Sequence, residues 1–311
     1  MKTYAPKYFE KFRCIADKCK HSCCIGWEIC IDSHTLDKYK SIEGPLGKRL
    51  AESIAVDEEG ASFRLCEDER CPFLNSKGLC DIIIEKGDSF LCEICREHPR
   101  FYNFFSDRTE AGIGLSCEEA ARIILSSEEK TELIVTEEDN TAEEELNEFE
   151  KYILSKRTKI ISELQDREKS IDARVEDVMK ICGASFPEIS LIEWHNVFLK
   201  LEILDQNWLT VINVLNKSET AHNVPETAYE QLLVYLVYRH TPLSEDKGDF
   251  ADRIAFACLG YKIIKNICER TDNCNFDMFC EICRMYSSEI EYSEDNTAAL
   301  IDIFKNNRKN F

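Results

Sequence analysis

Five cysteines crowd into one short segment near the start of this 311-residue chain, FRCIADKCKHSCCIGWEIC. They are Cys14, Cys19, Cys23, Cys24 and Cys30. Closely spaced thiols are reactive when exposed and are soft metal ligands when deprotonated, so such a group requires either a metal centre or disulfides. A chain of this length can bury a sizeable core without covalent staples. We therefore favour a metal centre.

The cysteine count and the first residues both argue against a disulfide framework. The chain has 17 cysteines, an odd number that cannot pair completely. Pro6 and Lys7 stand where a secretory leader would have an apolar run. In a reducing compartment, dense cysteine patterns are typical of metal-binding or catalytic sites. We expect a cytoplasmic protein without a membrane partner, because the longest apolar stretches fall far short of the roughly 20 residues that span a bilayer.

The charge of the chain limits its partners. The formal net charge is −20 at pH 7, and no stripe of Lys and Arg with interleaved aromatic residues occurs. Such a surface repels phosphate backbones, so we expect no nucleic-acid partner. A basic partner, or a protein substrate with exposed lysines, fits this charge better.

The composition divides the chain into two parts. Eleven cysteines lie in residues 1–120, and residues 128–150 carry eleven acidic side chains against the single Lys130. An acidic run of this kind is usually a linker or a solvated face. We therefore predict a cysteine-rich region over 1–127 and a helical domain over 128–311. The expected fold is mainly α, with a cysteine-rich N-terminal metal-binding region that has short β elements and packs on a C-terminal helical bundle.

Local patterns in the first part are short. Ile82–Ile84 is expected to form a short strand between turns. Ser116 followed by Glu119 is the pattern of a capping box, which predicts that a helix begins at that serine.

Longer helical patterns fill the second part. Ser190 and Glu193 predict another capping box, and the apolar spacing over 194–215 predicts that the helix after it is long. Pro225 suits the start of a further helix that ends at His240, and its residues 232–238 are apolar all round and should be buried.

The thiols form the strongest candidate site. A structural zinc ion requires four ligands, and a four-iron cluster likewise requires four cysteines, so spacing alone does not separate the two. Some of these cysteines could instead be small buried apolar residues. For Cys30, Cys66 and Cys92 the two interpretations are equally good. Cys19-x3-Cys23 is followed by Gly26 where radical enzymes that cleave S-adenosylmethionine have a third thiol, so that motif is not matched.

A second cysteine group lies near the C-terminus. It consists of Cys268, Cys274, Cys280 and Cys283. Two of these share a helical stripe with Phe276 and Tyr286, so core packing is the favoured interpretation.

Few other residues indicate chemistry. Arg96 and Arg100 follow the cysteine motifs, and their guanidinium groups could offset the charge of a cluster or bind the carboxylate of an amino-acid-like cofactor; a plain salt bridge is the commoner use. His195 shares a helix face with apolar residues and is predicted to be a satisfied core histidine.

Several motifs together resemble the flagellin lysine-N-methylase (FliB-like) family. The cysteine-rich half is also similar to YkgJ-type cysteine-cluster proteins. The motifs are Tyr4-Ala5-Pro6, Phe12-Arg13-Cys14, Cys19-x3-Cys23-Cys24-x-Gly26-Trp27, Cys71-Pro72-Phe73-Leu74-x3-Gly78-Leu79-Cys80, Cys95-Arg96-x2-Pro99-Arg100, Leu115-Ser116-Cys117, and the stretch from Ser287 to Asn296.

The resemblance implies an enzyme that transfers a methyl group from S-adenosylmethionine to lysine side chains of flagellin and contains a 4Fe-4S cluster, with zinc as the alternative metal. The implied ligands, of which four would hold the cluster, are Cys14, Cys19, Cys23, Cys24, Cys71, Cys80, Cys95 and Cys117. Arg96 and Arg100 are the expected cofactor-binding residues. Two other functions remain open: a non-catalytic zinc- or iron-chelating protein that binds a basic partner, and an iron–sulfur redox protein.

Overall fold

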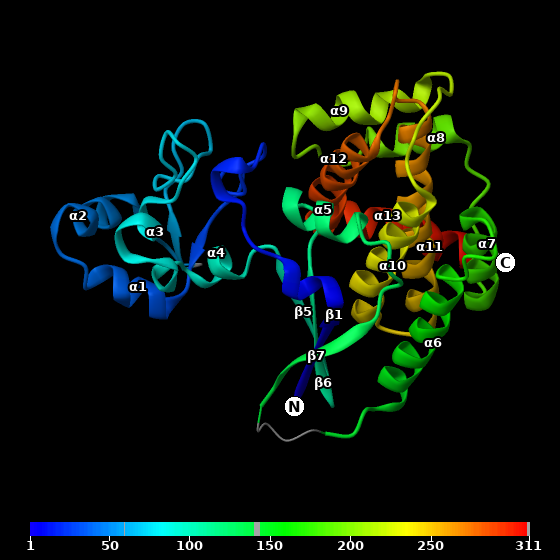
Figure 1. The fold of residues 1–311 in the computed structure, drawn as a ribbon, viewed down its shortest axis with the longest axis horizontal. Helices are drawn as coiled ribbons and strands as arrows, with labels where there is room; N and C mark the ends of the chain where they lie inside the picture. The colour runs from blue at the N-terminus through cyan, green and yellow to red at the C-terminus, as the bar shows by residue number, and fades with distance from the viewer. Residues whose placement is uncertain (59, 140–143, 310–311) are drawn as a thin grey trace. The chain divides into compact units, whose positions relative to one another are not determined.

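The computed structural model describes residues 1–58, 60–139 and 144–309 (Figure 1). It divides the chain into two compact units: unit 1 consists of residues 1–12 and 102–311, and unit 2 consists of residues 13–101. This division differs from the expected 1–127 and 128–311. Composition does not show which strands pair, and pairing joins the first residues of the chain to the helical part.

A four-stranded sheet in unit 1 makes that connection. Its strand order is β5-β6-β1-β7. β1 runs parallel to β6, with Thr3 opposite Thr109, and antiparallel to β7, with Tyr4 opposite Val135. The strands are β1 (Lys2–Pro6), β5 (Arg100–Phe105), β6 (Arg108–Ile113) and β7 (Leu133–Glu138).

The acidic run at 128–150 is therefore not simply a linker. β7 lies inside it and contributes Leu133, Ile134 and Val135 to the sheet. Residues 140–143 lie outside the described residues. The acidic side chains hid the strand because they dominate the composition of the run, whereas β7 depends on an edge position beside β1 that only the fold supplies.

Helices make up most of unit 1, and the prediction of a mainly α fold is confirmed. No described helix is both long and apolar enough to cross a bilayer. The helices are α5 (Glu118–Leu125), α6 (Glu148–Leu164), α7 (Ile171–Cys182), α8 (Leu191–Phe198), α9 (Gln206–Ile212), α10 (Glu226–His240), α11 (Lys247–Glu269), α12 (Phe276–Tyr286), a π-helical turn (Ser287–Glu291) and α13 (Glu294–Lys309).

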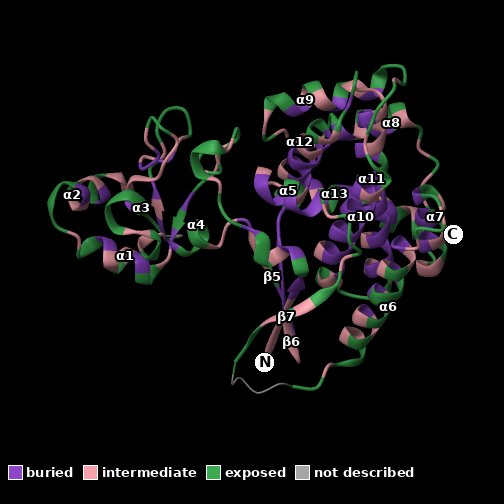
Figure 2. Ribbon diagram, in the orientation of Figure 1, coloured by how far each residue is buried: buried purple, intermediate pink, exposed green. Residues whose placement is uncertain are grey.

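α10 and α11 occupy the centre of this unit, as Figure 2 shows by their concentration of buried residues. Residues 232–238 are all buried, which confirms the prediction from their apolar composition. Gly260 lets α12 approach α11 closely, because a Cβ atom at this position would lie only 2.9 Å from the hydroxyl of Tyr286. The predicted start of α10 at Pro225 and its end at His240 are also confirmed.

The long helix predicted over 194–215 is wrong. α8 ends at Phe198, and α9 begins only at Gln206. Glu289 accepts hydrogen bonds from the backbone N–H groups of Leu204 (2.9 Å) and Asp205 (2.5 Å), which holds the intervening segment out of a helix. The apolar spacing continues across the break because both short helices pack on the same core.

One of the two predicted capping boxes is present. Ser190 and Glu193 form theirs at the start of α8. α5 instead begins after Cys117, and the Ser116 hydroxyl is buried without a hydrogen-bond partner. Glu119 does not reach back to the backbone because it forms an ion pair with Arg122, 2.6 Å from Oε1 to Nη2.

Unit 2 is built from short elements. Among its described residues, four α-helices and a three-stranded sheet of order β2-β4-β3 surround a small core that includes Tyr39, Phe63 and Phe73. The elements are α1 (Ser33–Lys40), α2 (Gly44–Ser53), α3 (Asp81–Lys86), α4 (Glu93–Glu97), β2 (Cys30–Ile31), β3 (Ile54–Val56) and β4 (Ala61–Phe63).

The strand predicted at Ile82–Ile84 is wrong, because these residues lie in α3. Only Ile82 is buried, while Ile83 and Ile84 are exposed. A run of three isoleucines favours a strand by propensity, but a single buried contact is enough to seat one turn of helix on the core.

Candidate metal centre

Five thiols converge on the core of unit 2. We call them the thiol cluster: Cys24, Cys71, Cys80, Cys92 and Cys95. All five pack on the hydrophobic core of the unit, and Cys71 and Cys92 are buried within it. They also influence one another electrostatically. Cys24 and Cys80 help to raise the pKa of Cys71, and Cys92, Cys24 and Cys71 help to raise the pKa of Cys95.

A glycine turn positions Cys24. The backbone N–H of Cys71 donates to the carbonyl of Cys24 (2.8 Å), and that of Gly26 donates to Glu69 (3.1 Å). Gly26 has φ +87°, a conformation that glycine adopts far more readily than cysteine. The residue that breaks the radical-enzyme motif is thus the residue that this turn requires.

A compact corner positions Cys71 and Cys80. The side chain of Asn75 accepts hydrogen bonds from the N–H groups of Lys77 and Leu79 and donates to Asp81 (2.9 Å). Arg49 pairs with Asp81 at 2.6 Å and also donates to the carbonyl of Pro72. These bonds fix both ends of the Cys71–Cys80 loop.

Cys92 and Cys95 enter the cluster from α4. Cys92 is the N-cap residue of α4, with an extended backbone, and Cys95 lies in the helix three residues later. Asp32 fixes the start of α4, because its Oδ2 accepts from the N–H of Glu93 at 2.9 Å. Sequence reasoning left Cys92 outside the ligand set, although its spacing to Cys95 was the signal that could have included it.

The pKa values of these thiols diverge according to their surroundings. A hydrogen bond from Cys23, with help from Arg70, lowers the pKa of Cys24 to about 7. Burial raises the pKa of Cys71 to about 12 and also raises that of Cys80. The thiol of Cys95 donates to Cys92, which raises the pKa of Cys95 and lowers that of Cys92. Cys24 and Cys92 are therefore the thiols closest to the ligand form, which is the thiolate.

The other predicted ligands are not part of the thiol cluster, although Cys23 contacts Cys24. Cys14 and Cys23 are exposed, and Cys19 is half-buried. Cys117 belongs to unit 1, where it precedes the first residue of α5. The structure thus gathers Cys24, Cys71, Cys80 and Cys95 from the predicted set.

The two predicted cofactor-binding arginines make local contacts. Arg96 pairs with Glu97 at 3.2 Å, and Arg100 donates to the carbonyl of Arg96 at 3.3 Å. The first of these contacts is the plain salt bridge that the sequence left as the alternative.

The thiol cluster suits a metal by its chemistry, because soft thiolates select zinc, copper(I) and iron–sulfur clusters. Within 1–58, 60–139 and 144–309, no three His, Cys, Asp or Glu side chains are grouped closely enough to hold a metal ion. The residue types of the thiol cluster thus suit a soft metal, but their side chains are placed as separate thiols.

A buried ionic cluster in unit 1 is the second candidate site. Oε1 of Glu291 lies 3.2 Å from Nε of Arg239 and 2.7 Å from Nε2 of His240, and Tyr235 donates its hydroxyl hydrogen to Oε2 at 3.2 Å. Burial acts to raise the pKa of Glu291, but His240 and Arg239 outweigh it and leave that pKa lowered. Glu291 ends the π-helical turn, a type of element often found at functional sites.

This ionic cluster connects two motifs distant in sequence. The N–H of Leu115, beside Cys117, donates to the hydroxyl of Tyr235 at 3.2 Å. Next to Glu291, the exposed ring of Tyr292 lies under the guanidinium of Arg239, 5.1 Å from the ring centroid. Sequence reasoning singled out 287–296 only by resemblance and did not find these partners, because they come from α10.

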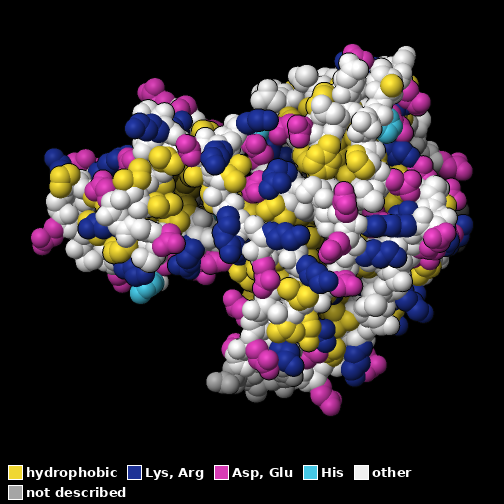
Figure 3. Space-filling model, in the orientation of Figure 1, with side chains coloured by type: hydrophobic (Ala, Val, Ile, Leu, Met, Phe, Trp, Pro, Cys, Tyr) yellow, Lys and Arg dark blue, Asp and Glu magenta, His cyan; other side chains and the backbone are white. Residues whose placement is uncertain are grey.

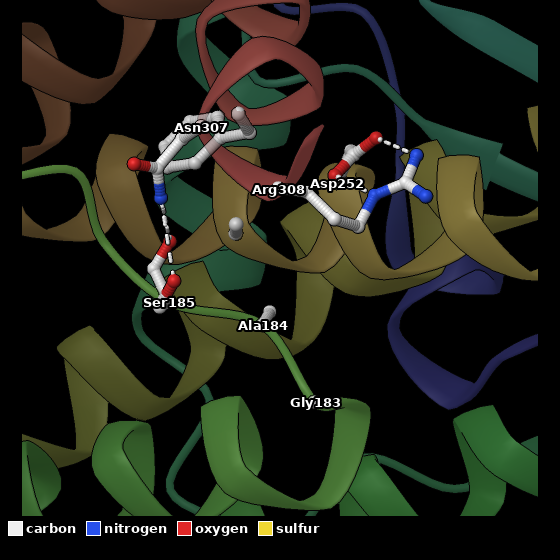
Figure 4. Close-up of a pocket in the computed structure, with 8 residues that line it drawn as sticks. Gly183, Ala184, Ser185, Asp252, Asn307 and Arg308 are labelled. Carbon is white, nitrogen blue, oxygen red and sulfur yellow. Dashed lines mark hydrogen bonds and ion pairs between the residues drawn. The ribbon is translucent and has the colours of Figure 1, made fainter. Parts of the chain in front are cut away.

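A small cavity lies between α11, α13 and the turn after α7 (Figure 4). Its volume is about 190 Å³, below the range of about 300–1,000 Å³ that is usual for ligand sites. Asp252 and Arg308 form a bidentate ion pair at the wall of the cavity, and Asn307 donates a hydrogen bond to Ser185 (Figure 4). Its polar groups are thus engaged with one another.

The surface shows no segregation of charge on the face drawn in Figure 3, where acidic and basic side chains are interspersed. The net charge of −20 is therefore not gathered into one acidic region on that face.

Comparison with known proteins gives the class of the chain. Residues 112–311 match the model of the FliB lysine N-methylase C-terminal domain, a stretch that includes α5 to α13. The chain belongs to this family. The resemblance to YkgJ-type proteins stays a prediction.

Two kinds of curated relative resemble the chain. A lysine-N-methylase of Salmonella typhimurium is 24% identical over 126 residues, which cover 39% of this chain and 31% of that protein. The flagellar biosynthetic protein FliU of Salmonella muenchen is 24% identical over 126 residues, which cover 75% of that protein. The match thus spans about a third of the curated lysine-N-methylase. No solved structure matches the chain.

Proposed function

We propose that this protein is an S-adenosylmethionine-dependent protein-lysine N-methyltransferase that acts on flagellin. The observation that carries the proposal is the family match over 112–311, which covers nearly all of the helical unit. The names of the relatives agree with it, since they refer to lysine methylation and to flagellar biosynthesis.

The reaction places two demands on the site. A lysine has an ordinary pKa of about 10.4, so it must lose a proton before its nitrogen can attack the sulfonium methyl carbon. Carbon and nitrogen must then approach in line at about 3 to 3.5 Å. The N–CH₃ bond forms as the S–CH₃ bond breaks, and the electron pair of that bond leaves with sulfur as S-adenosylhomocysteine.

We further propose that the thiol cluster holds a 4Fe-4S cluster, with zinc as the alternative metal. Cys24, Cys71, Cys80 and Cys95 are the proposed ligands, and Cys92 is the fifth thiol available. When bound, an iron–sulfur cluster would stabilise the small unit 2 and could accept or donate an electron. The residues of this chain would contribute the buried thiolates and the turns that carry them.

The experiment that tests the activity is a methylation assay. The protein is purified without oxygen and incubated with flagellin and S-adenosylmethionine carrying a deuterated methyl group. Mass spectrometry of the flagellin peptides should show labelled methyl groups on lysines. The absence of label on flagellin and on a lysine-rich control protein, with the metal content intact, would refute the methyltransferase proposal.

Metal analysis tests the cofactor separately. We expect iron and acid-labile sulfide in the wild type and their loss in Cys95→Ser. Cys30→Ser, an exposed cysteine of the same unit, is the matched control and should retain them. Stoichiometric zinc without iron would replace the iron–sulfur proposal by a structural zinc site.

A further inference from the structure

A separate group of cysteines lies where α11 meets α12 in unit 1. Cys268, Cys274 and Cys283 are completely buried, and the ring of Tyr229 from α10 packs beside them. The sequence predicted simple core packing for this group. The burial of these three cysteines confirms that interpretation for them, whereas Cys280, the fourth cysteine of the group, is only half-buried. The proximity of Cys268 and Cys274 also goes beyond packing.

Cys268 and Cys274 are brought together by a tight reversal of the chain. Cys268 is the penultimate residue of α11, and Cys274 comes directly before Asn275, the residue that caps α12. The N–H of Thr271 donates to the carbonyl of Cys268 (3.3 Å), and the N–H of Cys274 donates to that of Thr271 (3.2 Å). Within this reversal the two thiols lie close enough to affect each other's pKa, and the thiol of Cys274 donates to the carbonyl of Asn275 (3.9 Å).

The two thiols are chemically unequal. The interaction between the two thiols lowers the pKa of Cys274 and raises that of Cys268. Cys274 also lies next to the positive end of α12. A nucleophilic thiol beside a second thiol that can resolve its oxidised form is the arrangement found in redox-sensing proteins.

An irregular segment covers the reversal. In this segment, 217–224, the N–H of Thr220 donates to the carbonyl of Glu269 (2.6 Å), and that of Asn223 donates to the carbonyl of Cys274 (2.8 Å). The segment is mostly exposed and has no regular secondary structure. Segments of this kind open locally at low free-energy cost, which gives a small oxidant a route to buried thiols.

We propose that Cys268 and Cys274 form a redox-modification site that closes reversibly to a disulfide, with hydrogen peroxide or a related peroxide as the oxidant. The Cys274 thiolate attacks one peroxide oxygen and breaks the O–O bond, which gives a sulfenic acid and a hydroxide ion. Cys268 then attacks the sulfenic sulfur, forms the S–S bond and releases hydroxide. The two thiol protons leave in the two water molecules formed, the thiols lose two electrons, and the peroxide gains them.

The modification would act on the family domain itself. A bond between residues 268 and 274 ties the end of α11 to the start of α12, and α12 leads into the π-helical turn that carries Glu291. Neither the flagellin substrate nor the thiol cluster of unit 2 is needed for this inference.

Peptide mapping of the full chain tests the proposal. The purified protein is titrated with hydrogen peroxide, free thiols are blocked, and trypsin is added. Cleavage at Arg270 separates the two cysteines, so the disulfide joins the peptide 266–270 to the peptide 271–284. We expect this linked pair, two hydrogens lighter than the separate peptides, with Cys274 as the linked residue of the second peptide and with reversal by dithiothreitol.

Variants sharpen the result. Cys274→Ser should abolish the linked pair, whereas Cys283→Ser, which removes a neighbouring buried thiol, should retain it. Thr220→Pro removes the N–H that fastens the covering segment and should speed the reaction. A link to Cys280 or Cys283 in the wild type would overturn the proposal. So would the absence of any link at peroxide doses that oxidise the exposed Cys30, and both outcomes are read in the wild type whether or not the variants fold.

Discussion

The two units reach a folded state by different means. Unit 1 buries long helices, with 15 residues in α10 and 23 in α11, and their large apolar side chains account for much of its interior. Unit 2 has helices of five to ten residues, and five of the side chains at its core are thiols. Short helices are marginal by themselves, and small cores supply little stability. The comparison teaches that unit 1 can rely on apolar packing, whereas unit 2 would gain most from the metal that we propose for it.

Removal of the metal should have the largest effect on the difference in stability between the two units. Stripping the metal, or substituting Cys95→Ser, should destabilise unit 2 by several kcal/mol, since structural zinc alone contributes about 10–16 kcal/mol in small domains. Hydrogen exchange read by mass spectrometry should show protection lost over 13–101 and kept over α10 and α11. Equal loss in both units, or no loss in unit 2, would contradict the assignment of the metal to the thiol cluster.

Disrupting a buried ion pair should selectively destabilise unit 1. Nη2 of Arg157 lies 2.5 Å from Oε1 of Glu110, and both side chains are almost completely buried. Glu110→Gln should cost about 3–5 kcal/mol, because it leaves the guanidinium charge buried and unpaired. The midpoint of urea unfolding, followed by tryptophan fluorescence in a Trp27→Phe background, reports unit 1 through Trp194 and Trp208.

The matched control for this pair replaces both partners. Glu110→Leu with Arg157→Met should cost much less than Glu110→Gln alone, since no charge is left unpaired. If the double variant is the less stable of the two, the pair stabilises unit 1 by more than charge compensation.

Acidification should also act on unit 1 through His240. Burial lowers the pKa of this histidine below its ordinary 6.5, so the folded protein holds it neutral. The unfolded chain takes up a proton as the pH falls below 6.5, and the stability that this group contributes above that pH is progressively lost. Glu291, with its lowered pKa, adds a loss in the same direction at lower pH.

The variant His240→Gln isolates the contribution of this histidine. It should flatten the decline of unit 1 stability just below pH 6.5 and leave the exchange of unit 2 amides unchanged. A decline of the same steepness in the variant would show that other groups control the acid sensitivity of unit 1.

Substitutions of helix-capping residues should have the smallest effects on stability. Ser170 caps α7 through one bond to the N–H of Ala173, whereas Asp32 accepts from Thr35 in α1 and also from Glu93 in α4. We expect Ser170→Ala to cost about 1 kcal/mol and Asp32→Ala about 1–2 kcal/mol. Thermal unfolding measures both, and a larger cost at Ser170 would contradict the expectation that Asp32 adds stability by linking α1 to α4.

Short-range patterns in the sequence correctly predicted the features that depend on neighbouring residues. The capping box at Ser190 and Glu193, the start of α10 after Pro225 and the burial of 232–238 are present. His195 is a buried histidine with Asn213 as its partner at 2.9 Å, which confirms the core interpretation. Each of these features depends on residues within one helix or on the average polarity of a segment.

The residues of the candidate metal site were likewise predictable only where local spacing was sufficient. The cysteine spacings indicated a thiol site, and four of the eight predicted ligands pack on the core of unit 2. The spacings could not indicate that Cys92 joins them, or that Cys117 lies in the other unit, because these positions depend on how α4 packs and where the chain enters the sheet.

The sequence by itself determined the helical class, the helix that follows Pro225 and ends at His240, and the existence of a thiol-rich region, because periodicity, caps and composition act over a few residues. Only the tertiary structure decided that β1 pairs with β6 and β7, that Glu289 interrupts the helix after Phe198, and that Cys268 meets Cys274. These features depend on partners far apart in the chain or on the exact path of a turn, and no single segment encodes the position of another.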